Sequence, residues 1–433
     1  MSDHIFRPET LAIHAGQVPD RETGARALPI YQTTSFVFDS AEHAAALFNL
    51  QTFGNVYSRL SNPTVAALEE RVAALEGGRA AVASASGMAA EAMALMTLLQ
   101  AGDHVVAAGA LYGGSVSLLA VSLAKFGITT TFVDATRPDA FAAAIRPETR
   151  AVFAESLGNP SLTVLDIAAV ADVAHAHGLP LVIDNTVPSP YLCNPLALGA
   201  DIVVHSATKY LGGHGTTLGG VIVEGGRFDW GNGKFPGMTE PSAGYHGVKF
   251  FETFGDFAFA MRARMETLRI YGAALSPQSA WQILQGVETL PLRMERHCRN
   301  ALQVARHLQS HPLVSWVNYP GLPDHPQHAL VQKQMRQADG VPGASGLLAF
   351  GVKGDAAAGV RFIEAAQFMS HLANIGDTRT LVIHPASTTH RQLDEAQQRA
   401  AGATPDLVRL SVGLEHIDDI LWDIDQALAA AAR

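Results

Sequence analysis

The apolar positions of this chain fall into short runs that alternate with stretches of helical periodicity. A first run, Ala80–Met88, is predicted to be a short strand that breaks at Ser86-Gly87. Six further runs are predicted to be strands: His104–Ala108, Thr129–Val133, Ala151–Glu155, Leu181–Asp184, Ile202–His205 and Val221–Val223. Most are apolar on both sides, which is typical of strands buried on both faces. Strands that alternate with helices predict an α/β fold with a mostly parallel seven-stranded sheet between helices.

A second, smaller unit is predicted after the sheet. Residues 277–308 have the pattern of long helices that lead out of the first domain. Strands are predicted at Leu347–Val352, Leu381–His384 and Leu407–Val412, and the last helix carries an apolar stripe that includes Ile417, Ile424 and Leu428. The predicted organisation is an arm over residues 1–60, a large domain over 61–285 and a small α+β domain over 286–433.

Two segments lack these patterns. Residues 1–60 have no long periodic run, which predicts an extended arm that wraps a neighbouring subunit. Residues 228–275 are rich in Gly, Pro and Phe and are predicted to be an insertion near the functional site, because long irregular segments in compact domains are usually functional.

Composition narrows the class of function. The chain has 433 residues, 48% of them hydrophobic, so it can bury a large core. A formal net charge of −10 without Lys/Arg runs argues against a nucleic-acid partner. No apolar stretch approaches the roughly 20 residues of a membrane span, and no signal-peptide pattern opens the chain, so a cytoplasmic protein is expected. Cys193 and Cys298 are expected to be ordinary buried thiols, and the 18 histidines form no ligand pattern, so no metal is expected.

The chain from Asp201 to Gly215 carries the strongest chemical signal. A strand ends in Ser206 and Thr208, Lys209 follows, and glycines come next. Ligands bind at the carboxyl ends of parallel strands, so this lysine is expected to face a ligand. An amine beside hydroxyls and glycines fits pyridoxal 5′-phosphate, whereas the alternative is a solvated surface lysine.

Two further strand ends carry related signals. Gly87 lies between a strand and the helix former Ala89–Leu99, which makes either an anion site or an ordinary turn. The strand Leu181–Asp184 ends in an aspartate, which would hold a proton on the nitrogen of the cofactor ring or cap a helix.

Other residues are ambiguous when each is taken alone. Arg409 stands within an apolar strand and demands an anion, which is either an internal carboxylate or the carboxylate of an amino-acid substrate. Tyr112 and Asn159 lie in turns after strands, where each is either a ligand contact or part of an ordinary loop. Arg59 is either solvated or clamped on a phosphate. The loop His384–His390 offers hydroxyls near Arg409 or forms a capping cluster.

Taken together, these motifs resemble one family of enzymes. The segments YSRLSNPT, SASGMAA, LYGGS, the Asn-Pro after Glu155, DNT, SATKYLGGHG and RLSVGLE occur in the order of the cystathionine γ-synthase-like family of pyridoxal-phosphate enzymes. The resemblance covers nearly the whole chain and implies the PLP-dependent transferase fold of type I.

The resemblance also implies roles for individual residues. Lys209 would bond covalently to the cofactor, Asp184 would bind the ring nitrogen, and Tyr112 would stack on the ring. Further implied contacts are Asn159 at the ring hydroxyl, Gly87, Met88, Ser206 and Thr208 at the phosphate, Tyr57 and Arg59 from a neighbouring subunit, and Arg409, Ser387 and Asn374 at the substrate. A tetramer of two dimers is implied as well.

Within the family, residues 228–275 and the run Ala373–Asp377 look like O-acetylhomoserine sulfhydrylases. Methionine γ-lyases carry a cysteine in the turn where Gly113 and Gly114 stand here, and cystathionine γ-synthases typically lack the insertion. O-succinylhomoserine stays open as a substrate. The implied reaction is γ-replacement, in which sulfide or methanethiol displaces acetate from O-acetyl-L-homoserine to give homocysteine or methionine. A non-catalytic scaffold is the alternative of another class, but it would have no physical reason to keep Lys209, Asp184 and Arg409 together.

Overall fold

A computed structural model describes residues 5–354, 357–388, 391 and 404–433. Within these residues the larger sheet has seven strands in the order β1-β7-β6-β5-β4-β2-β3. Its strands are β1 (Ala80–Ser84), β2 (His104–Ala108), β3 (Thr129–Val133), β4 (Thr149–Glu155), β5 (Leu181–Asp184), β6 (Ile202–Ser206) and β7 (Gly220–Glu224). The predicted mostly parallel sheet is confirmed, and β7 is the strand that runs antiparallel to both of its neighbours.

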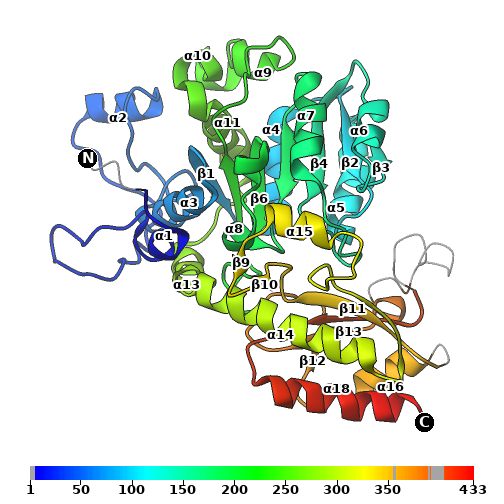
Figure 1. Cartoon of the computed structure of the whole chain (residues 1–433). Helices are drawn as coiled ribbons and strands as arrows, with labels where there is room; N and C mark the ends of the chain where they lie inside the picture. The colour runs from blue at the N-terminus through cyan, green and yellow to red at the C-terminus, as the bar shows by residue number, and fades with distance from the viewer. Residues whose placement is uncertain (1–4, 355–356, 389–390, 392–403) are drawn as a thin grey trace.

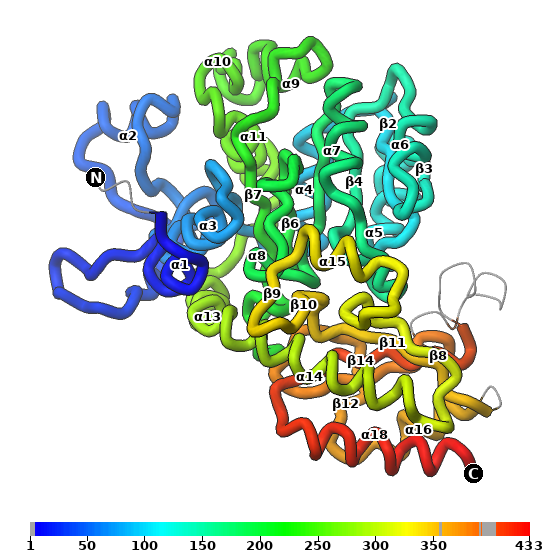
Figure 2. The backbone as a smooth tube through the Cα atoms, viewed as in Figure 1, coloured from blue at the N-terminus to red at the C-terminus, as the bar shows by residue number. Residues whose placement is uncertain are grey.

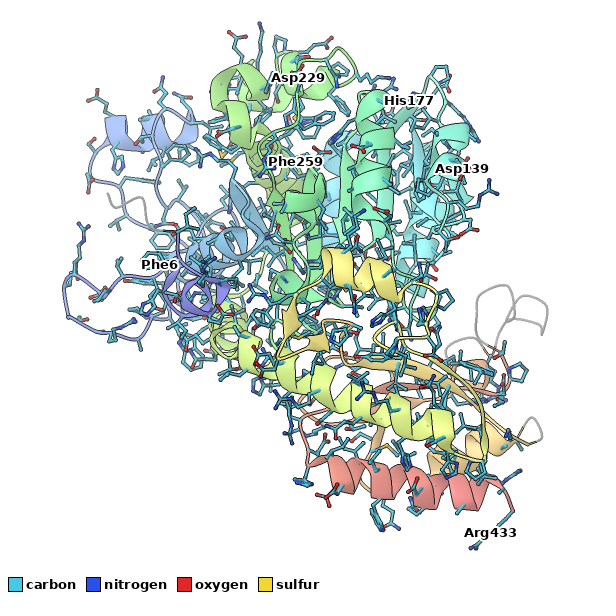
Figure 3. The ribbon with its side chains drawn as sticks, viewed as in Figure 1. Phe6, Asp139, His177, Asp229, Phe259 and Arg433 are labelled. Atoms are coloured by element: carbon cyan, nitrogen blue, oxygen red, sulfur yellow. The ribbon has the colours of Figure 1, made fainter. Side chains whose placement is uncertain are left out.

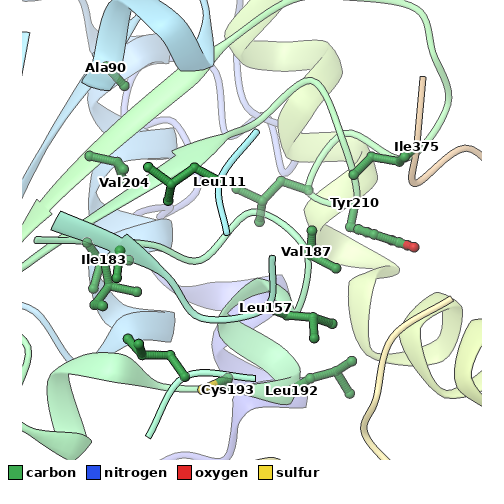
Figure 4. Packing of buried hydrophobic residues seen from close by; sticks show 14 of the residues in the cluster. Ala90, Leu111, Leu157, Ile183, Val187, Leu192, Cys193, Val204, Tyr210 and Ile375 are labelled. Atoms are coloured by element: carbon green, nitrogen blue, oxygen red, sulfur yellow. The ribbon is translucent and has the colours of Figure 1, made fainter. Parts of the chain in front are cut away.

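The core of this sheet follows from its apolar strands. Val105, Val106 and Ala107 in β2 are fully buried, as are the apolar residues of β5. Figure 4 shows Ile183 and Val204 among the buried side chains that fill this region. Helices α4 (Gly87–Leu98), α6 (Pro138–Ala144) and α7 (Ile167–Ala176) pack on the strands, as Figure 1 shows.

The carboxyl ends of the central strands lie side by side. In the strand register Glu155 pairs with Asp184, and Asp184 pairs with Val204, two residues before Ser206. Helix α4 begins close by, where the Ser86 hydroxyl accepts a hydrogen bond from Ala89 N at 3.1 Å. Four segments far apart in sequence therefore deliver polar groups to one edge of the sheet.

A five-stranded sheet in the order β12-β13-β14-β11-β8 lies beyond this edge (Figure 1). Its strands are β8 (Val314–Asn318), β11 (Leu347–Val352), β12 (Ser370–His371), β13 (Leu381–Ile383) and β14 (Leu407–Ser411). Helices α14 (Leu290–Ser310), α16 (Ala358–Ala365) and α18 (Ile417–Ala431) accompany it. The helices predicted over 277–308 are α13 (Pro277–Glu288) and α14, whereas β8 was not predicted.

The first 60 residues are only partly an extended arm. They contain α1 (Pro8–His14) and α2 (Ala41–Phe48), two short helices that the sequence pattern did not predict. Helix α1 packs on its own chain, where Ala12 is fully buried and Arg71 Nε donates to Ala15 O at 2.8 Å. The rest of the segment projects from the body of the molecule in Figure 2, with Val37 97% exposed.

The segment over residues 228–275, whose sequence is irregular, contains several short helices. It contains α9 (Pro236–Thr239), α10 (Phe250–Phe254) and α11 (Ala258–Arg262). Trp230 Nε1 donates to Glu224 Oε1 at 3.2 Å, and Asn232 Nδ2 donates to Gly178 O at 3.0 Å. Gly178 precedes β5 and Glu224 ends the antiparallel β7, so residues 228–235 lie at the amino ends of the parallel strands. Figure 3 shows Asp229 at the end of the molecule opposite Arg433, and the prediction that this segment lies near the site is wrong for this part.

Three smaller predictions concern cysteines, membranes and metals. Cys193 and Cys298 are both buried and unpaired, which confirms the prediction of ordinary buried thiols. No helix in the described part of the chain is long and apolar enough to cross a membrane. Over the same residues, no group of three or more His, Cys, Asp or Glu side chains is arranged to hold a metal ion.

Candidate active site

A pocket of about 260 Å³ lies at the carboxyl ends of the central strands. Its walls come from the large sheet, the start of α4 and the small sheet with its preceding loop. Its lining side chains include Glu91, Tyr112, Glu155, Asn159, Asp184, Lys209, Asn374 and Arg409. The pocket combines an amine, a guanidinium and three carboxyl groups in a confined space.

Lys209 enters the pocket from the turn after β6. Its Nζ donates a hydrogen bond to Oδ1 of Asn374, which belongs to the loop before β13. Burial, and then the nearby positive charge of Arg409, together lower the pKa of Lys209 to about 8. A lysine with this pKa exposes a nucleophilic amine at a pH where an ordinary lysine is almost fully protonated.

The lowered pKa makes a prediction for the protein without its cofactor. The neutral amine is the reactive form, so acetylation of Lys209 by acetic anhydride should increase as pH rises, with a midpoint near 8. Mass spectrometry of the Lys209 peptide across a pH series measures this midpoint. A midpoint at the ordinary lysine value of about 10.4 would contradict the predicted effect of burial and Arg409.

Arg409 reaches the same pocket from β14 in the small sheet. Its Nη1 donates to Asn159 Oδ1 at 2.9 Å, and its Nη2 donates to the backbone oxygen of Asn374 at 3.3 Å. Burial lowers the pKa of Arg409 to about 10, so the group stays cationic at neutral pH. Asn374 thus contacts both cations of the pocket, through its side chain to Lys209 and through its backbone to Arg409.

Glu155 holds two loops of the site in place. Its Oε1 accepts from Tyr112 N at 2.5 Å, and its Oε2 accepts from Asn159 N at 3.2 Å. Burial and the charge of Asp184 raise the pKa of Glu155, and the two backbone donors offset part of that rise. A single carboxyl group therefore fixes the backbone of the residue that carries the aromatic ring and of the residue that contacts Arg409.

Asp184 and Glu91 supply the other two carboxyl groups of the pocket. Asp184 Oδ1 accepts from Thr186 N at 2.7 Å, which orients its carboxyl group at the end of β5. Glu91 lies in α4 and is 3% exposed, and its Oε1 accepts from the Ser115 hydroxyl at 2.9 Å. Burial first, and then the neighbouring charge of Asp184, raises the pKa of Glu91 well above its ordinary value.

The groups around the pocket fit pyridoxal phosphate, the predicted cofactor. The α4 amino terminus presents free backbone N–H groups, and a Cβ on Gly87 would lie 2.5 Å from Cβ of Ser206, so only glycine permits this close approach of helix and strand. The hydroxyl-bearing Ser206 and Thr208 line the pocket beside it. A helix amino terminus for a phosphate, an amine for an aldehyde and a carboxylate for a ring nitrogen are the groups that pyridoxal phosphate requires.

Comparison with known proteins assigns the chain to a family. The profile of the family described as Cys/Met metabolism PLP-dependent enzyme matches residues 9–429. The chain belongs to this family.

Individual members of the Cys/Met metabolism family are similar over the whole chain. An O-acetyl-L-homoserine sulfhydrylase of Leptospira meyeri is 56% identical, covering 98% of this chain and 97% of its own length. An O-acetyl-L-homoserine sulfhydrylase of Thermus thermophilus is 52% identical over 98% of this chain and 100% of its own length. The crystal structure of a putative O-acetylhomoserine (thiol)-lyase of Campylobacter jejuni, with N′-pyridoxyl-lysine-5′-monophosphate, has a TM-score of 0.94 at 41% identity, covering 98% of this chain and 100% of that chain. The fold of type I implied by the sequence is therefore confirmed, as is the dependence on pyridoxal phosphate.

The pocket brings together most of the residues singled out in the sequence. Its lining includes Gly87, Met88, Tyr112, Asn159, Asp184, Ser206, Thr208, Lys209, Asn374 and Arg409. Ser387 is not among the lining residues, and its hydroxyl instead lies 2.9 Å from His384 Nδ1. Thr389 and His390 of the same loop lie outside the described residues.

Tyr57 and Arg59 also lie outside the pocket of their own chain. Arg59 Nη1 donates to Arg269 O at 2.6 Å, and its guanidinium stands 5.4 Å from the centre of the Tyr57 ring. Neither residue lines the pocket that this chain forms, and Tyr57 is 42% exposed.

Two carboxyl groups of the pocket were missed in the sequence. Glu155 was noted only as the end of a strand, and Glu91 only as part of a helix former. Glu155 had a findable signal, because a carboxylate at the carboxyl end of a central parallel strand faces the ligand edge. Glu91 had none, since one glutamate in a helix of Ala, Met and Leu has the same appearance whether it faces solvent or the interior.

Proposed function

We propose that this enzyme catalyses γ-replacement on O-acetyl-L-homoserine, with sulfide displacing acetate to give L-homocysteine. The observation that carries the proposal is the placement of Lys209 and Arg409 in one pocket, joined through Asn374. An amino acid whose carboxylate met Arg409 would bring its α carbon toward the Lys209 amine. Full-length similarity to proteins named O-acetyl-L-homoserine sulfhydrylase supports the choice of substrate.

Each residue of the pocket has a part in this chemistry. Pyridoxal phosphate, when bound, withdraws electrons from the substrate carbons and so makes their protons acidic. Lys209 would bond to it at rest and then move protons between the α and β carbons of the substrate. Asp184 would keep the ring nitrogen protonated, Tyr112 would stack on the ring, and Asn159 would contact the ring hydroxyl. Gly87, Met88, Ser206 and Thr208 would bind the phosphate.

Replacing the arginine of the small sheet should separate substrate binding from chemistry. Arg409→Lys keeps the charge but loses the planar pair of donors, so we expect KM for O-acetyl-L-homoserine to rise by about 10- to 100-fold with a smaller change in kcat. Steady-state kinetics measure both constants, and the cofactor absorbance serves as the control, because it should not change. An unchanged KM would contradict the role of Arg409 at the substrate carboxylate.

A second copy of the chain is proposed to complete the site, in a homotetramer built from two dimers. The support is that Tyr57 and Arg59 do not line the pocket of their own chain and lie on a segment with large exposed apolar side chains. Phe53 is 74% exposed, and Val18 is 72% exposed. Burial of such side chains against a second copy would remove apolar surface from water.

Mixing two inactive variants tests this sharing of residues. Arg59→Ala and Lys209→Ala are each expected to be nearly inactive alone, because every site lacks one group. After mixing under conditions that exchange subunits, a hybrid pair has one site with both groups intact, so about a quarter of wild-type activity should return on statistical exchange. No recovery, with exchange verified by mass spectrometry of differently tagged copies, would contradict a shared site.

The two cysteines indicate the cellular compartment of the protein. Both thiols are free and buried, and free thiols persist in reducing compartments. The cytoplasm is proposed on this ground.

Incubations of the purified protein with different substrates distinguish the proposed reaction from its alternatives. O-acetyl-L-homoserine with sulfide should yield homocysteine and acetate, and replacing sulfide with methanethiol should yield methionine. Methionine alone should yield no α-ketobutyrate. The reverse pattern would establish a lyase, and turnover of O-succinyl-L-homoserine in preference to the acetyl ester would overturn the acyl selectivity.

A further inference from the structure

Glu91 is a buried carboxyl group on the pocket wall, and it has no part in the reaction proposed above. It projects from α4, is 3% exposed, and lines the pocket together with Asp184 and Glu155. Its Oε1 accepts from the Ser115 hydroxyl, whereas its Oε2 is buried and has no hydrogen-bond donor among the described residues. A buried carboxylate oxygen without a donor costs free energy, which a bound proton removes.

The neighbour of Glu91 is another carboxyl group. Asp184 lines the same pocket, and its negative charge acts on the Glu91 carboxyl group. Two ionised carboxylates in one buried pocket repel each other, but a proton shared between them would replace the repulsion with a strong hydrogen bond. Burial and the negative charge of Asp184 both raise the pKa of Glu91, which favours Glu91 as the group that keeps the proton.

The hydrogen bonds made by the neighbouring carboxyl groups favour Glu91 as the group that holds the proton. Asp184 already accepts from Thr186 N at 2.7 Å, and Glu155 accepts from the two backbone donors Tyr112 N and Asn159 N. Donors of this kind stabilise the ionised form of a carboxyl group. Glu91 has one donor, Ser115, and an unsatisfied second oxygen, so its protonated form is the best satisfied of the three.

We propose that Glu91 is a positioning residue for the cofactor: its protonated carboxyl group donates a hydrogen bond to Asp184 and keeps Asp184 ionised against the ring nitrogen. The proposal rests on the proposed role of Asp184. A neutral donor on the far side of Asp184 makes that carboxylate less basic, so the proton stays on the ring nitrogen rather than moving to Asp184. Glu91 would act through Asp184 and not on the substrate itself.

Two substitutions at Glu91 separate this role from a charge or a packing role. Glu91→Gln keeps the shape, accepts from Ser115 and offers an N–H donor to Asp184, so it should reproduce the wild type. Glu91→Leu keeps a helix-forming side chain of similar size but removes the donor. Protein stripped of cofactor and reconstituted with pyridoxal phosphate labelled with ¹⁵N in the ring gives the ring protonation directly from the ¹⁵N chemical shift, and titration gives the cofactor Kd.

The expected results differ clearly between the two variants. Glu91→Gln should keep a protonated ring nitrogen and a Kd within about twofold of wild type, whereas Glu91→Leu should weaken binding by about tenfold or more and show an increased share of unprotonated ring. If Gln and Leu lose affinity equally, Glu91 acts as a charge and the proposal is overturned. If neither changes affinity or protonation, Glu91 is only a packing residue and the proposal is again overturned.

Two controls make the failures distinguishable. Glu224→Gln removes the charge of another buried glutamate at the opposite edge of the sheet and should leave the cofactor Kd unchanged. Asp184→Asn tests the underlying role: if it keeps wild-type Kd and ring protonation, both the role of Asp184 and that of Glu91 fall. If Asp184→Asn weakens binding while the Glu91 variants match each other, only the role of Glu91 falls. If the Leu variant misfolds, Glu91→Gln still tests the proposal, because a loss of affinity or of ring protonation in this variant would overturn it.

Discussion

Lys209→Ala is expected to abolish turnover, by roughly a thousandfold or more, and to remove the visible absorbance of cofactor covalently held by the protein. The substitution deletes the amine that bonds to the cofactor and the group that moves protons between substrate carbons. The neighbouring residues offer no replacement, because Asn374 and Arg409, which flank the amine, are not bases at neutral pH. Absorbance spectra and a homocysteine assay on the same preparation measure both effects.

A lysine elsewhere provides the control for this experiment. Lys234 lies against Gly178 at the amino ends of the parallel strands, the edge opposite the pocket. Lys234→Ala should therefore keep both the spectrum and the activity of the wild type. Activity that survived Lys209→Ala, with visible cofactor absorbance retained, would remove the basis of the proposed mechanism.

Asp184→Asn is expected to have the second largest effect. Asparagine keeps the oxygen that accepts from Thr186 N but carries no charge, so it cannot hold a proton on the ring nitrogen. An unprotonated ring withdraws electrons less strongly, and we expect kcat to fall roughly a hundredfold or more. The melting temperature should change little, because the hydrogen bond at the end of β5 is retained.

Steady-state kinetics and thermal unfolding test this prediction together. A normal kcat in the Asn variant would show that ring protonation does not depend on Asp184. A large loss of stability would show that the carboxylate has a structural part that the neutral amide cannot replace.

The sequence was sufficient to predict the centre of the site because of the geometry of parallel sheets. Asp184 and Lys209 follow strands that are neighbours in space, and the carboxyl ends of such strands meet at one edge. The apolar runs that predict β5 and β6 also place these two residues. The apolar pattern that predicts each strand therefore also predicts where these two residues lie in the structure.

The features missed in the sequence depend on contacts between distant segments. Helix α1 is short, and its burial depends on contacts with α3 (Pro63–Glu76), such as the bond from Arg71 to Ala15 O. The position of residues 228–235 depends on Trp230 and Asn232 meeting Glu224 and Gly178. Nothing in a local hydrophobic pattern specifies such partners.

Buried carboxyl groups were the least predictable part of the site. Glu91 and Glu155 belong to a residue type that is almost always exposed, so the prior expectation for each is a solvated side chain. Their burial follows from Ser115, Tyr112 N and Asn159 N, which are supplied by other segments. The structure was therefore needed to reveal that three acidic groups share this pocket.

Chemical trapping of the bound cofactor tests directly whether Lys209 is the lysine that carries it. Borohydride reduction of the purified wild-type protein, followed by proteolysis and mass spectrometry, identifies the lysine that carries the pyridoxyl group. The modification is expected on Lys209, in the peptide that contains Ser206 and Thr208. A pyridoxyl group on another lysine, with Lys209 unmodified, would contradict this expectation.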